Sequence, residues 1–456
     1  MSHAWNFKSR APGEVWPGVP GPEAASLLAL QFQLERSQWL SPERLSALQY
    51  RQLESLLQHA YSTVPYYRER WHGIYDSKQP FAPEKFYELP ILKRREVQAR
   101  FESLSSTGIP SNHGGVSESR TSGSMGMPIR VLKTSLTQLL WEAIVLREHS
   151  WFQRNLGGKL AAIRHGAAHQ NNVVGWGSAT LAVVEGGLSA TLPINVEVGQ
   201  QFRWLERQQP DFLMSYPSNI AELARTSIEL NASIPKLREV RTFGEVLTPD
   251  IRELCRKAWD VPVTDSYSSQ EIGYIALQCP KHNHYHVQSE CVLVEIVDED
   301  GRPCARGQMG RVIVTALHNF AMPLIRYDIG DYAAWGAPCD CGRSLPVLSR
   351  IAGRVRNTLV LATGERYWPS LNLGSLAGGA PVIQQQLVQK SVDSIEVRLV
   401  TLRSLTADEE AHMRHHLQSR LPAPFDIRFS YREEIVRGAG GKFEEFISEV
   451  AYPSPA

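Results

Sequence analysis

The sequence predicts an α/β protein with a large N-terminal domain and a small α+β domain at its C-terminal end. Two observations lead to this prediction. Short apolar runs at residues 160–163 and 211–214 resemble strands of a parallel sheet. Helical segments such as residues 220–230 lie between such runs and give an alternating order of strand and helix. Residues 353–456 instead show alternating strands around one long helix, so we predict a boundary between residues 1–352 and 353–456.

The elements of the N-terminal third are predicted from caps and periodicity. The first forty residues are rich in Pro and Gly and are expected to wrap the surface. Ser41 and Pro42 form a favourable helix start, with a hydroxyl cap and a proline in the first turn. Pro90 ends one element before a polar helix, and residues 135–150 are predicted to form a buried helix. The apolar face expected for the helix that starts at Ser41 consists of Leu45, Leu48, Leu53, Leu56, Leu57 and Ala60.

The later strands are predicted from β-branched runs or alternation. Asp298-Glu299-Asp300-Gly301 is a turn sequence between two of them. Residues 406–421 are expected to form the long helix of the C-terminal domain, with Thr406 as its N-cap. The strands are predicted at residues 291–297, 311–315, 359–361, 394–399 and 426–429.

Length and composition limit the class of protein. A chain of 456 residues and 51.1 kDa is long enough for two or three domains with a sizeable core. The net charge of +1 gives no field that would attract nucleic acid or an anionic membrane. There is no run of eighteen apolar residues and no apolar core of a secretory signal at the start. Six cysteines form no disulfide framework in a chain of this size, so we expect a cytoplasmic enzyme; a homodimer is left open.

The most informative segment is a loop rich in hydroxyls and glycine at residues 121–128. Gly123 and Gly126 can adopt backbone angles that are closed to other residues. It is not the nucleoside-triphosphate loop that ends in Gly-Lys-Ser/Thr, because no lysine follows Gly126 and Pro128 opposes a helix start. A linker is the alternative for such a turn. Backbone amides could converge on phosphate oxygens together with the hydroxyls of Thr121, Ser122 and Ser124.

Further segments follow this loop in a fixed order. They are Thr242-Phe243-Gly244-Glu245, residues 265–273 (DSYSSQEIG), residues 323–331 (PLIRYDIGD), Gly353-Arg354 and Gly440-Gly441-Lys442-Phe443. The ordered set resembles the adenylate-forming enzymes, which include acyl- and aryl-coenzyme A ligases, luciferases and peptide-synthetase adenylation domains. Within them it is most similar to the phenylacetate–coenzyme A ligase branch. The resemblance runs from about Leu45 to Ile447.

The resemblance implies the activation of a small carboxylic acid by ATP and Mg²⁺ in two half-reactions. The carboxylate attacks the α-phosphate, which releases pyrophosphate and leaves an acyl-adenylate; a thiol such as that of coenzyme A then displaces AMP. The first step brings an anion against a polyanion and needs Mg²⁺, backbone amides and a cation. The implied fold is a large ATP- and acid-binding domain, with mixed or parallel sheets flanked by helices, and a small mobile lid.

Several residue roles are implied by the matching motifs. Glu271 matches the magnesium ligand, which suits a cation held by one or two carboxylates. Lys442 matches the lysine that bridges the carboxylate and the α-phosphate during adenylation. Met127 stands where the family's phosphate loop usually has lysine, so one cation is missing from this loop. The phosphate loop itself is matched by Thr121, Ser122, Gly123, Ser124 and Gly126.

The remaining implied contacts concern the nucleoside and the acyl group. Tyr267 would flank the adenine ring, Asp331 would accept both ribose hydroxyls, and Arg354 would add a second ribose or phosphate contact. A surface salt bridge is the alternative for Asp331 and Arg354. The full set of nucleotide contacts also contains Gly244, Glu245, Ser266 and Ser268. The regions that wall the acyl group contain Trp176, Tyr216, Pro217 and Ser268, with Arg164 and His165 expected nearby. Aromatic residues suit an aryl or flat acid, although each tryptophan is as readily a core residue.

A second group of residues is typical of a metal site. Thiolates and imidazoles suit tetrahedral zinc. The resemblance to some relatives of the phenylacetate ligases implies a structural site made by Cys279, His286, Cys339 and Cys341. His282, His284 or Cys291 could substitute, and the alternative is polar loop histidines beside free thiols.

The sequence therefore predicts an AMP-forming acid–thiol ligase that passes an aryl or related acyl group to coenzyme A. Transfer to a carrier protein or an amine is the first alternative, because Arg356-Asn357 stand where the family has an acidic pair at the hinge. The second alternative is a non-catalytic nucleotide-binding relative. The presence of Glu271, Asp331 and Lys442 argues against this second alternative.

Overall fold

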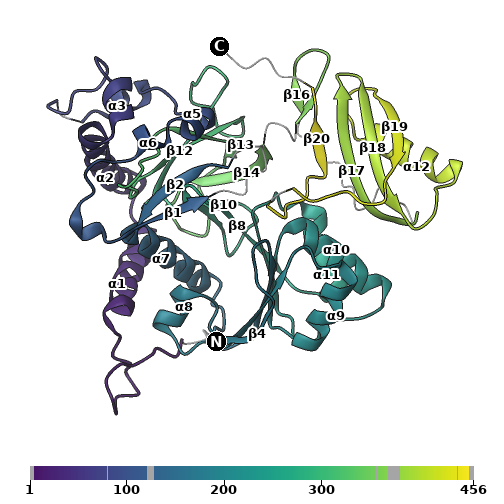
Figure 1. The fold of residues 1–456 in the computed structure, drawn as a ribbon, viewed down its shortest axis with the longest axis horizontal. Helices are drawn as coiled ribbons and strands as arrows, with labels where there is room; N and C mark the ends of the chain where they lie inside the picture. The colour runs from purple at the N-terminus through teal and green to yellow at the C-terminus, as the bar shows by residue number, and fades with distance from the viewer. Residues whose placement is uncertain are drawn as a thin grey trace.

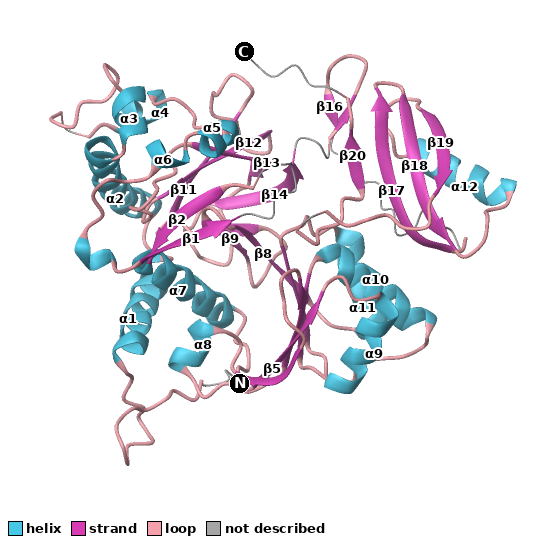
Figure 2. Ribbon diagram, in the orientation of Figure 1, coloured by secondary structure: helices cyan, strands magenta, loops and turns pink. Residues whose placement is uncertain are grey.

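The structure is a computed structural model, and it confirms the predicted α/β class. Figures 1 and 2 show a large part built on an extended sheet with helices packed around it, and a smaller part with a separate sheet and a helix. None of the helices in the described part of the chain is long and apolar enough to cross a membrane. The structure describes residues 5–79, 81–120, 128–354, 358–367, 380–438 and 440–450.

The N-terminal segment is more helical than predicted. Its helices are α1 (Pro22–Ser37), α2 (Pro42–Thr63), α3 (Pro65–Arg70), α4 (Pro83–Glu88), α5 (Arg94–Ala99) and α6 (Phe101–Leu104), followed by the short 3-10 helix η1 (Ser111–His113). The prediction missed α1, because Pro and Gly dominate the composition around the helix-forming run that begins at Glu23. The helix α2 begins as predicted, since the Ser41 hydroxyl accepts a hydrogen bond from the Arg44 amide at 3.3 Å. Leu48 was placed on its buried face wrongly, because 46% of Leu48 is exposed.

The large sheet contains twelve strands among the described residues, in the order β11-β12-β13-β14-β10-β9-β8-β7-β6-β3-β5-β4. The pairs from β5 to β8 are parallel, as predicted, and the pairs from β8 to β11 are antiparallel. Their bounds are β3 (Leu160–Arg164), β4 (Gln170–Val174), β5 (Leu188–Pro193), β6 (Phe212–Ser215), β7 (Glu239–Phe243), β8 (Val263–Ser269), β9 (Gly273–Gln278), β10 (Tyr285–Val287), β11 (Val292–Val297), β12 (Met309–Ala316), β13 (Tyr327–Trp335) and β14 (Val347–Arg354).

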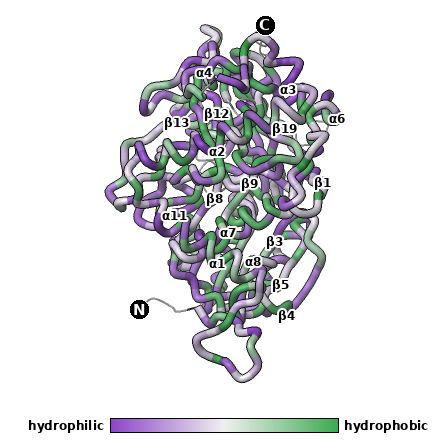
Figure 3. The backbone as a smooth tube through the Cα atoms, turned by 90° about the vertical axis from the view of Figure 1, so that its left-hand side faces the viewer, coloured by the Kyte–Doolittle hydropathy of each residue, from purple (hydrophilic) through white to green (hydrophobic). Residues whose placement is uncertain are grey.

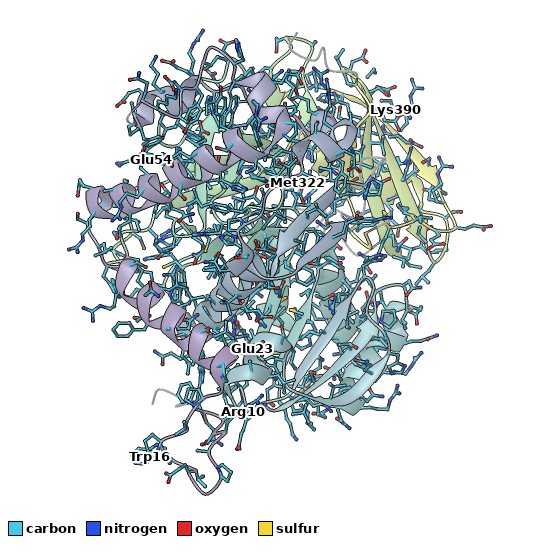
Figure 4. The ribbon with its side chains drawn as sticks, turned by 60° about the vertical axis from the view of Figure 1, so that its left-hand side comes forward. Arg10, Trp16, Glu23, Glu54, Met322 and Lys390 are labelled. Carbon is cyan, nitrogen blue, oxygen red and sulfur yellow. The ribbon has the colours of Figure 1, made fainter. Side chains whose placement is uncertain are left out.

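Two layers of helices flank the parallel half of this sheet. On one side α7 (Ser135–Trp151) and α8 (Ser178–Val183) pack with α1, and Figure 3 shows the three together near the foot of the molecule. On the other side lie α9 (Val198–Gln208), α10 (Pro217–Glu229) and α11 (Pro249–Trp259). A separate hairpin of β1 (Val116–Arg120) and β2 (Arg130–Thr134) precedes α7. Figure 4 shows Trp16 at the tip of a projecting N-terminal loop, where 87% of this side chain is exposed.

The C-terminal part has its own sheet and core. Its four-stranded sheet has the order β19-β18-β17-β20, and α12 (Ala407–Gln418) packs on it through Met413 and Leu417. Thr406 caps α12 as predicted, accepting a hydrogen bond from the Glu409 amide at 3.2 Å. Gly353 and Arg354 still pair with the large sheet, opposite Tyr332 and Asp331. The strands are β15 (Leu359–Val360), β16 (Arg366–Tyr367), β17 (Val382–Ser391), β18 (Ser394–Thr401), β19 (Asp426–Tyr431) and β20 (Phe446–Ser448).

A buried ionic network joins the end of α7 to the large sheet. Arg154 is fully enclosed and binds Glu239 at 2.6 Å and Glu148 at 3.0 Å. Arg241 binds the other oxygen of Glu148 at 2.9 Å. Burial of charges is costly unless each has a partner, so the network ties these elements together only while it is complete.

We therefore expect Arg154→Met to lower the free energy of unfolding by about 3–5 kcal/mol, because it leaves Glu239 enclosed without its cation. Urea titration followed by circular dichroism measures this loss. The matched control is Arg238→Met, which removes an arginine whose side chain is 60% exposed and whose partner is Asp211; its cost should stay below about 1 kcal/mol. Equal costs for the two variants would contradict the prediction.

Candidate active site

A cleft with a volume of about 1160 Å³ lies between the large sheet and the C-terminal part. It opens at the carboxyl ends of the parallel strands β7 and β8, where open α/β sheets bind their ligands. The predicted phosphate loop, residues 121–127, lies outside the described residues, but Arg120 directly before it lines the cleft. The predicted residues that line the cleft are Tyr216, Gly244, Glu245, Ser266, Tyr267, Ser268, Glu271, Asp331 and Lys442, with Arg164 and His165.

The nucleoside residues predicted from separate motifs meet at one wall of the cleft. The Tyr267 hydroxyl donates a hydrogen bond to Asp331 Oδ2 at 2.8 Å, which joins β8 to β13. Arg354 pairs with Asp331 in the register of β13 and β14, and its side chain is outside the described part of the structure. The wall therefore offers an aromatic ring beside a carboxylate, as the base and ribose of a nucleotide require.

Hydrogen bonds beneath β8 hold this wall in place. The buried carboxylate of Asp265 accepts from the Thr242 hydroxyl and from the Tyr285 hydroxyl, each at 2.6 Å. Burial raises the pKa of Asp265 to about 6, while these hydrogen bonds oppose the rise. Asp265 thus connects β7, β8 and β10 directly behind Ser266 and Tyr267.

Glu271 also lines the cleft and is almost wholly enclosed, with 5% exposure. Its Oε1 lies 3.5 Å from Arg94 Nη1 and accepts a hydrogen bond from the Tyr327 hydroxyl at 3.4 Å. Next to it, Lys133 Nζ donates to the carbonyl of Gln270 at 2.5 Å. A carboxylate oxygen held at the edge of a polar cleft is the kind of donor that Mg²⁺ takes together with phosphate oxygens.

The Lys442 side chain lines the cleft, and its end lies against Gly244. Gly244 has a φ of +77°, and a Cβ at this position would lie 3.3 Å from Lys442 Cε and 3.5 Å from Lys442 Nζ. Glycine alone tolerates both this backbone angle and this close approach. The lysine of the C-terminal motif and the glycine of the β7 motif are therefore brought together.

The loop that carries Lys442 is fastened to the large part by Glu245. Its carboxylate accepts hydrogen bonds from the Phe443 amide at 2.7 Å and from the Ser218 amide at 2.9 Å. The Tyr216 hydroxyl donates to the carbonyl of Gly440 at 3.2 Å. Figure 1 shows the segment that leads into β20 passing beside α10, where these contacts lie.

Arg437 forms a second fastening that the sequence did not reveal. Its guanidinium donates to Ser218 Oγ at 2.9 Å and to Glu222 Oε2 at 3.1 Å, and it packs on the Phe443 ring. A single arginine in a loop carries no motif, so only the fold indicates its partner. Ser218 and Glu222 lie on the first turns of α10.

The same junction gathers carboxylates around Glu445. Burial raises the pKa of Glu445 to about 7, nearby Arg225 lowers it, and the neighbouring carboxylates raise it further. These neighbours, Asp250, Glu245 and Glu222, all belong to the large part. Separation of the C-terminal part would return Glu445 toward the ordinary glutamate pKa of about 4.3.

This shift predicts a pH-dependent junction. The assembled arrangement binds the Glu445 proton more tightly, so Glu445 favours it fully below about pH 4.3 and ceases to do so as pH rises through about 7. We expect amide exchange in residues 440–446, corrected for its intrinsic pH dependence, to become faster between pH 6 and 8. Glu445→Gln should remove most of this change, whereas Glu434→Gln, at an exposed site in the same part, should retain it. An unchanged profile in Glu445→Gln would refute the assignment.

Two residues predicted to wall the acyl group are not among those that line the cleft. Trp176 donates through Nε1 to the carbonyl of Gly158 at 3.0 Å and packs on Phe212, in the layer of α7 and α8. Pro217 is buried at the first position of α10. The cleft wall is formed instead by Tyr216 and Phe243, whose ring centroids are 4.9 Å apart, and by Trp141.

The predicted cysteine and histidine ligands converge at the opposite end of β9. Cys279 Sγ lies 3.8 Å from Cys339 Sγ, and Cys341 Sγ lies 3.4 Å from His286 Nε2. Two sulfurs bound to zinc at about 2.3 Å in a tetrahedron would be about 3.8 Å apart. The Nδ1 of His286 contacts the carbonyl of Leu345 at 3.2 Å, which directs Nε2 toward the thiols. His284 also lies within this group and offers a further ligand.

Comparisons with known proteins identify relatives of this chain. The sequence profile of the CapK C-terminal domain family matches residues 371–449. Phenylacetate–coenzyme A ligase of Thermus thermophilus is 26% identical over 73% of this chain and 75% of its own length. The Escherichia coli phenylacetate–coenzyme A ligase is 25% identical over 87% of this chain and 92% of its own length. The chain is a homologue of the phenylacetate–coenzyme A ligases. The resemblance predicted from its motifs is thereby confirmed.

Solved structures agree on the fold. 2-Hydroxyisobutyryl-CoA ligase in the postadenylation state covers 91% of this chain and 92% of its own, with 20% identity and a TM-score of 0.71. The same ligase in its thioesterification state covers the same 91% of this chain and 91% of its own at 19% identity, with a TM-score of 0.57. Both structures therefore share the fold of this chain.

Proposed function

We propose that the protein is a ligase that uses ATP and Mg²⁺ to convert a small carboxylic acid to an acyl-adenylate and then transfers the acyl group to coenzyme A. At the level of enzyme class, the prediction of an AMP-forming acid–thiol ligase is confirmed by its homologues and structural neighbours. The roles of individual residues and the identity of the acid are part of the proposal.

The meeting of Lys442 with Gly244 and Glu245 carries the proposal. It brings a flexible cation to the boundary between the aromatic wall at Tyr216 and the nucleoside wall at Tyr267. A carboxylate that approaches the α-phosphate meets strong repulsion, and a cation aimed at both groups stabilises the charge that develops. Glu245 fixes the loop through the Phe443 amide, so Lys442 is held ready beside the site of attack.

The other cleft residues would bind and orient the nucleotide. Tyr267 would pack on the adenine, and the Asp331 carboxylate would accept the ribose hydroxyls. Glu271 fits a magnesium site because it is an enclosed carboxylate that opens on the cleft. A bound Mg²⁺ would supply charge neutralisation at the phosphates. Displacement of AMP by coenzyme A then requires the C-terminal part to move, because Lys442 and Phe443 now cover the acyl side.

An aryl or other flat acid is the proposed substrate class. Tyr216, Phe243 and Trp141 give the cleft an aromatic wall, which favours a flat apolar group. Pyrophosphate release from ATP, measured over a panel of aryl and alkyl acids with and without coenzyme A, tests this proposal. Release with aryl acids that continues to thioester only with coenzyme A is the expected result. Release that needs a carrier protein or an amine would favour the alternative acceptors.

Lys442→Ala should separate the two half-reactions. We expect acid-dependent pyrophosphate release to fall by roughly 10²–10³-fold, the size of effect seen when a donor to a developing charge is removed. Conversion of supplied acyl-adenylate to thioester should stay near normal, because lid movement removes this lysine from the site. Lys390→Ala, at an exposed lysine of the same part that pairs with Glu449, is the control. Equal losses in both assays would contradict a role confined to adenylation.

We also propose that Cys279, His286, Cys339 and Cys341 hold a structural zinc ion. The sulfur–sulfur distance and the donor set support a closed tetrahedral site with no position for substrate. The ligands come from the end of β9, from β10 and from the loop between β13 and β14. Zinc would therefore link these three segments and stabilise the antiparallel half of the large sheet.

The zinc proposal predicts one equivalent of zinc per chain by elemental analysis. Cys339→Ser should lose this metal and lower the melting temperature by several degrees, since zinc binding contributes to the free energy of folding. Turnover of the protein that remains folded should change less. Cys291→Ser provides the control, because Cys291 is a partly buried thiol packed against the hydrophobic core and does not belong to the metal-ligand groups found among the described residues. Metal-free wild-type protein with an unchanged melting temperature would refute this proposal.

A further inference from the structure

The cleft holds a buried arginine that the proposed function has not yet used. Arg94 lines the cleft, and only 15% of its side chain is exposed. Its Nη1 lies 3.5 Å from Glu271 Oε1. Its Nε is buried and has no hydrogen-bond partner within the part of the chain that the structure describes. A guanidinium has five donors, so Arg94 keeps others for a ligand beside those it uses on Glu271 and on the Tyr327 side chain.

The phosphate loop lacks a cation, and Arg94 can supply that positive charge instead. The sequence has Met127 where the phosphate loop of the resembling family usually has a lysine, and the triphosphate needs positive charge around it. The loop connects β1 to β2, and its last described residue on the β1 side, Arg120, lines the same cleft as Arg94. Arginine binds phosphate through paired, charge-assisted hydrogen bonds and therefore suits the task.

The fold holds Arg94 in place through contacts that lie outside the cleft. Arg326 of the 323–331 motif donates to the carbonyls of Tyr87 and Leu89 and to the Glu295 carboxylate. Leu92 pairs with the start of β13, donating to the carbonyl of Arg326 and accepting from the Asp328 amide, each at 2.9 Å. The segment that leads into α5 is thereby fixed on β13.

The helix α5 adds a second constraint on Arg94, which is its first residue. The Glu96 carboxylate accepts from the Lys93 amide at 2.8 Å and from the Tyr66 hydroxyl at 2.9 Å. The helix start is therefore fixed from both sides. The Arg94 side chain is directed toward Glu271 by a rigid backbone rather than by a flexible loop.

The other cations near this end of the cleft are less suited to the role. Lys133 Nζ already donates to the Gln270 carbonyl and lies over the Trp141 ring, at 5.5 Å from its centre. Arg252 donates to the Val263 carbonyl and to the Gln278 side chain. Arg120 is 69% exposed and is paired with Glu118 at 2.7 Å. Arg94 combines burial, free donors and proximity to the candidate magnesium ligand.

We propose that Arg94 binds the β- and γ-phosphates of ATP and supplies the positive charge that Met127 does not. The inference rests on the proposed function and identifies a further binding residue for its first half-reaction. In the protein without nucleotide, Arg94 neutralises Glu271. A Mg²⁺ held by Glu271 would neutralise phosphate charge at this carboxylate, and Arg94, whose Nη1 lies 3.5 Å from Glu271 Oε1, would add a second cation at the same place.

Binding of two nucleotides by the full-length protein tests this role. Calorimetry should show that Arg94→Ala weakens the binding of magnesium–ATP by roughly 10- to 100-fold, the worth of one or two charge-assisted hydrogen bonds. Binding of AMP, which has neither a β- nor a γ-phosphate, should change less than about twofold, and this also shows that the variant is folded. Arg94→Lys should retain most of the ATP affinity. Arg95→Ala, one residue further along the same helix and exposed, should match the wild type.

A rescue experiment separates charge from structure. Met127→Lys introduced into Arg94→Ala should restore most of the affinity for magnesium–ATP, because it returns a cation to the phosphate loop. Unchanged ATP binding in Arg94→Ala would overturn the proposal. So would an equal loss of ATP and AMP binding in both Arg94→Ala and Arg94→Gln. A wild-type protein that binds neither nucleotide would overturn the proposed function itself, which is a different result.

Discussion

The closed cleft depends on one carboxylate, that of Glu245. It accepts one amide from the start of α10 and one from the loop of Lys442, so a single side chain joins the end of β7, the acyl wall and the C-terminal part. Burial raises the pKa of this carboxyl, and the two amides lower it again. Glu245 keeps both amide partners only while the loop is in place, and these two hydrogen bonds position Lys442.

The sequence predicted the residues of the cleft best where a motif sits at the end of a strand. Tyr267, Glu271 and Asp331 line one cleft because β8, the turn that follows it and β13 belong to the same sheet. Expectations that rested on the family resemblance alone are matched less closely. Trp176 was expected near the acyl group because its region walls that group in the family, but it packs in the layer of α7 and α8 and is not among the residues that line the cleft. The helix α1 was missed because composition concealed a short helix-forming run.

The arginines could not be assigned from sequence for a related reason. The partners of Arg437 and Arg94 lie 215 and 177 residues away in the chain, and no spacing of residues in the sequence predicts such contacts. Arg326 shows the converse case. It lies within a recognisable motif, yet its guanidinium holds the chain segment before α5 instead of pointing to the nucleotide. A motif therefore marks a place in the fold more reliably than it marks a contact with substrate.

Gly244 has a consequence for how the two parts of the molecule can change over time. A methyl group at this position would press on the side chain of Lys442, which belongs to the other part, and the backbone angle of +77° disfavours any side chain. A substitution in the large part would thus disturb the position of a side chain that belongs to the small part. Gly244 of the large part and Lys442 of the small part are therefore matched, and a larger residue at position 244 would strain the backbone and require the end of this lysine to shift.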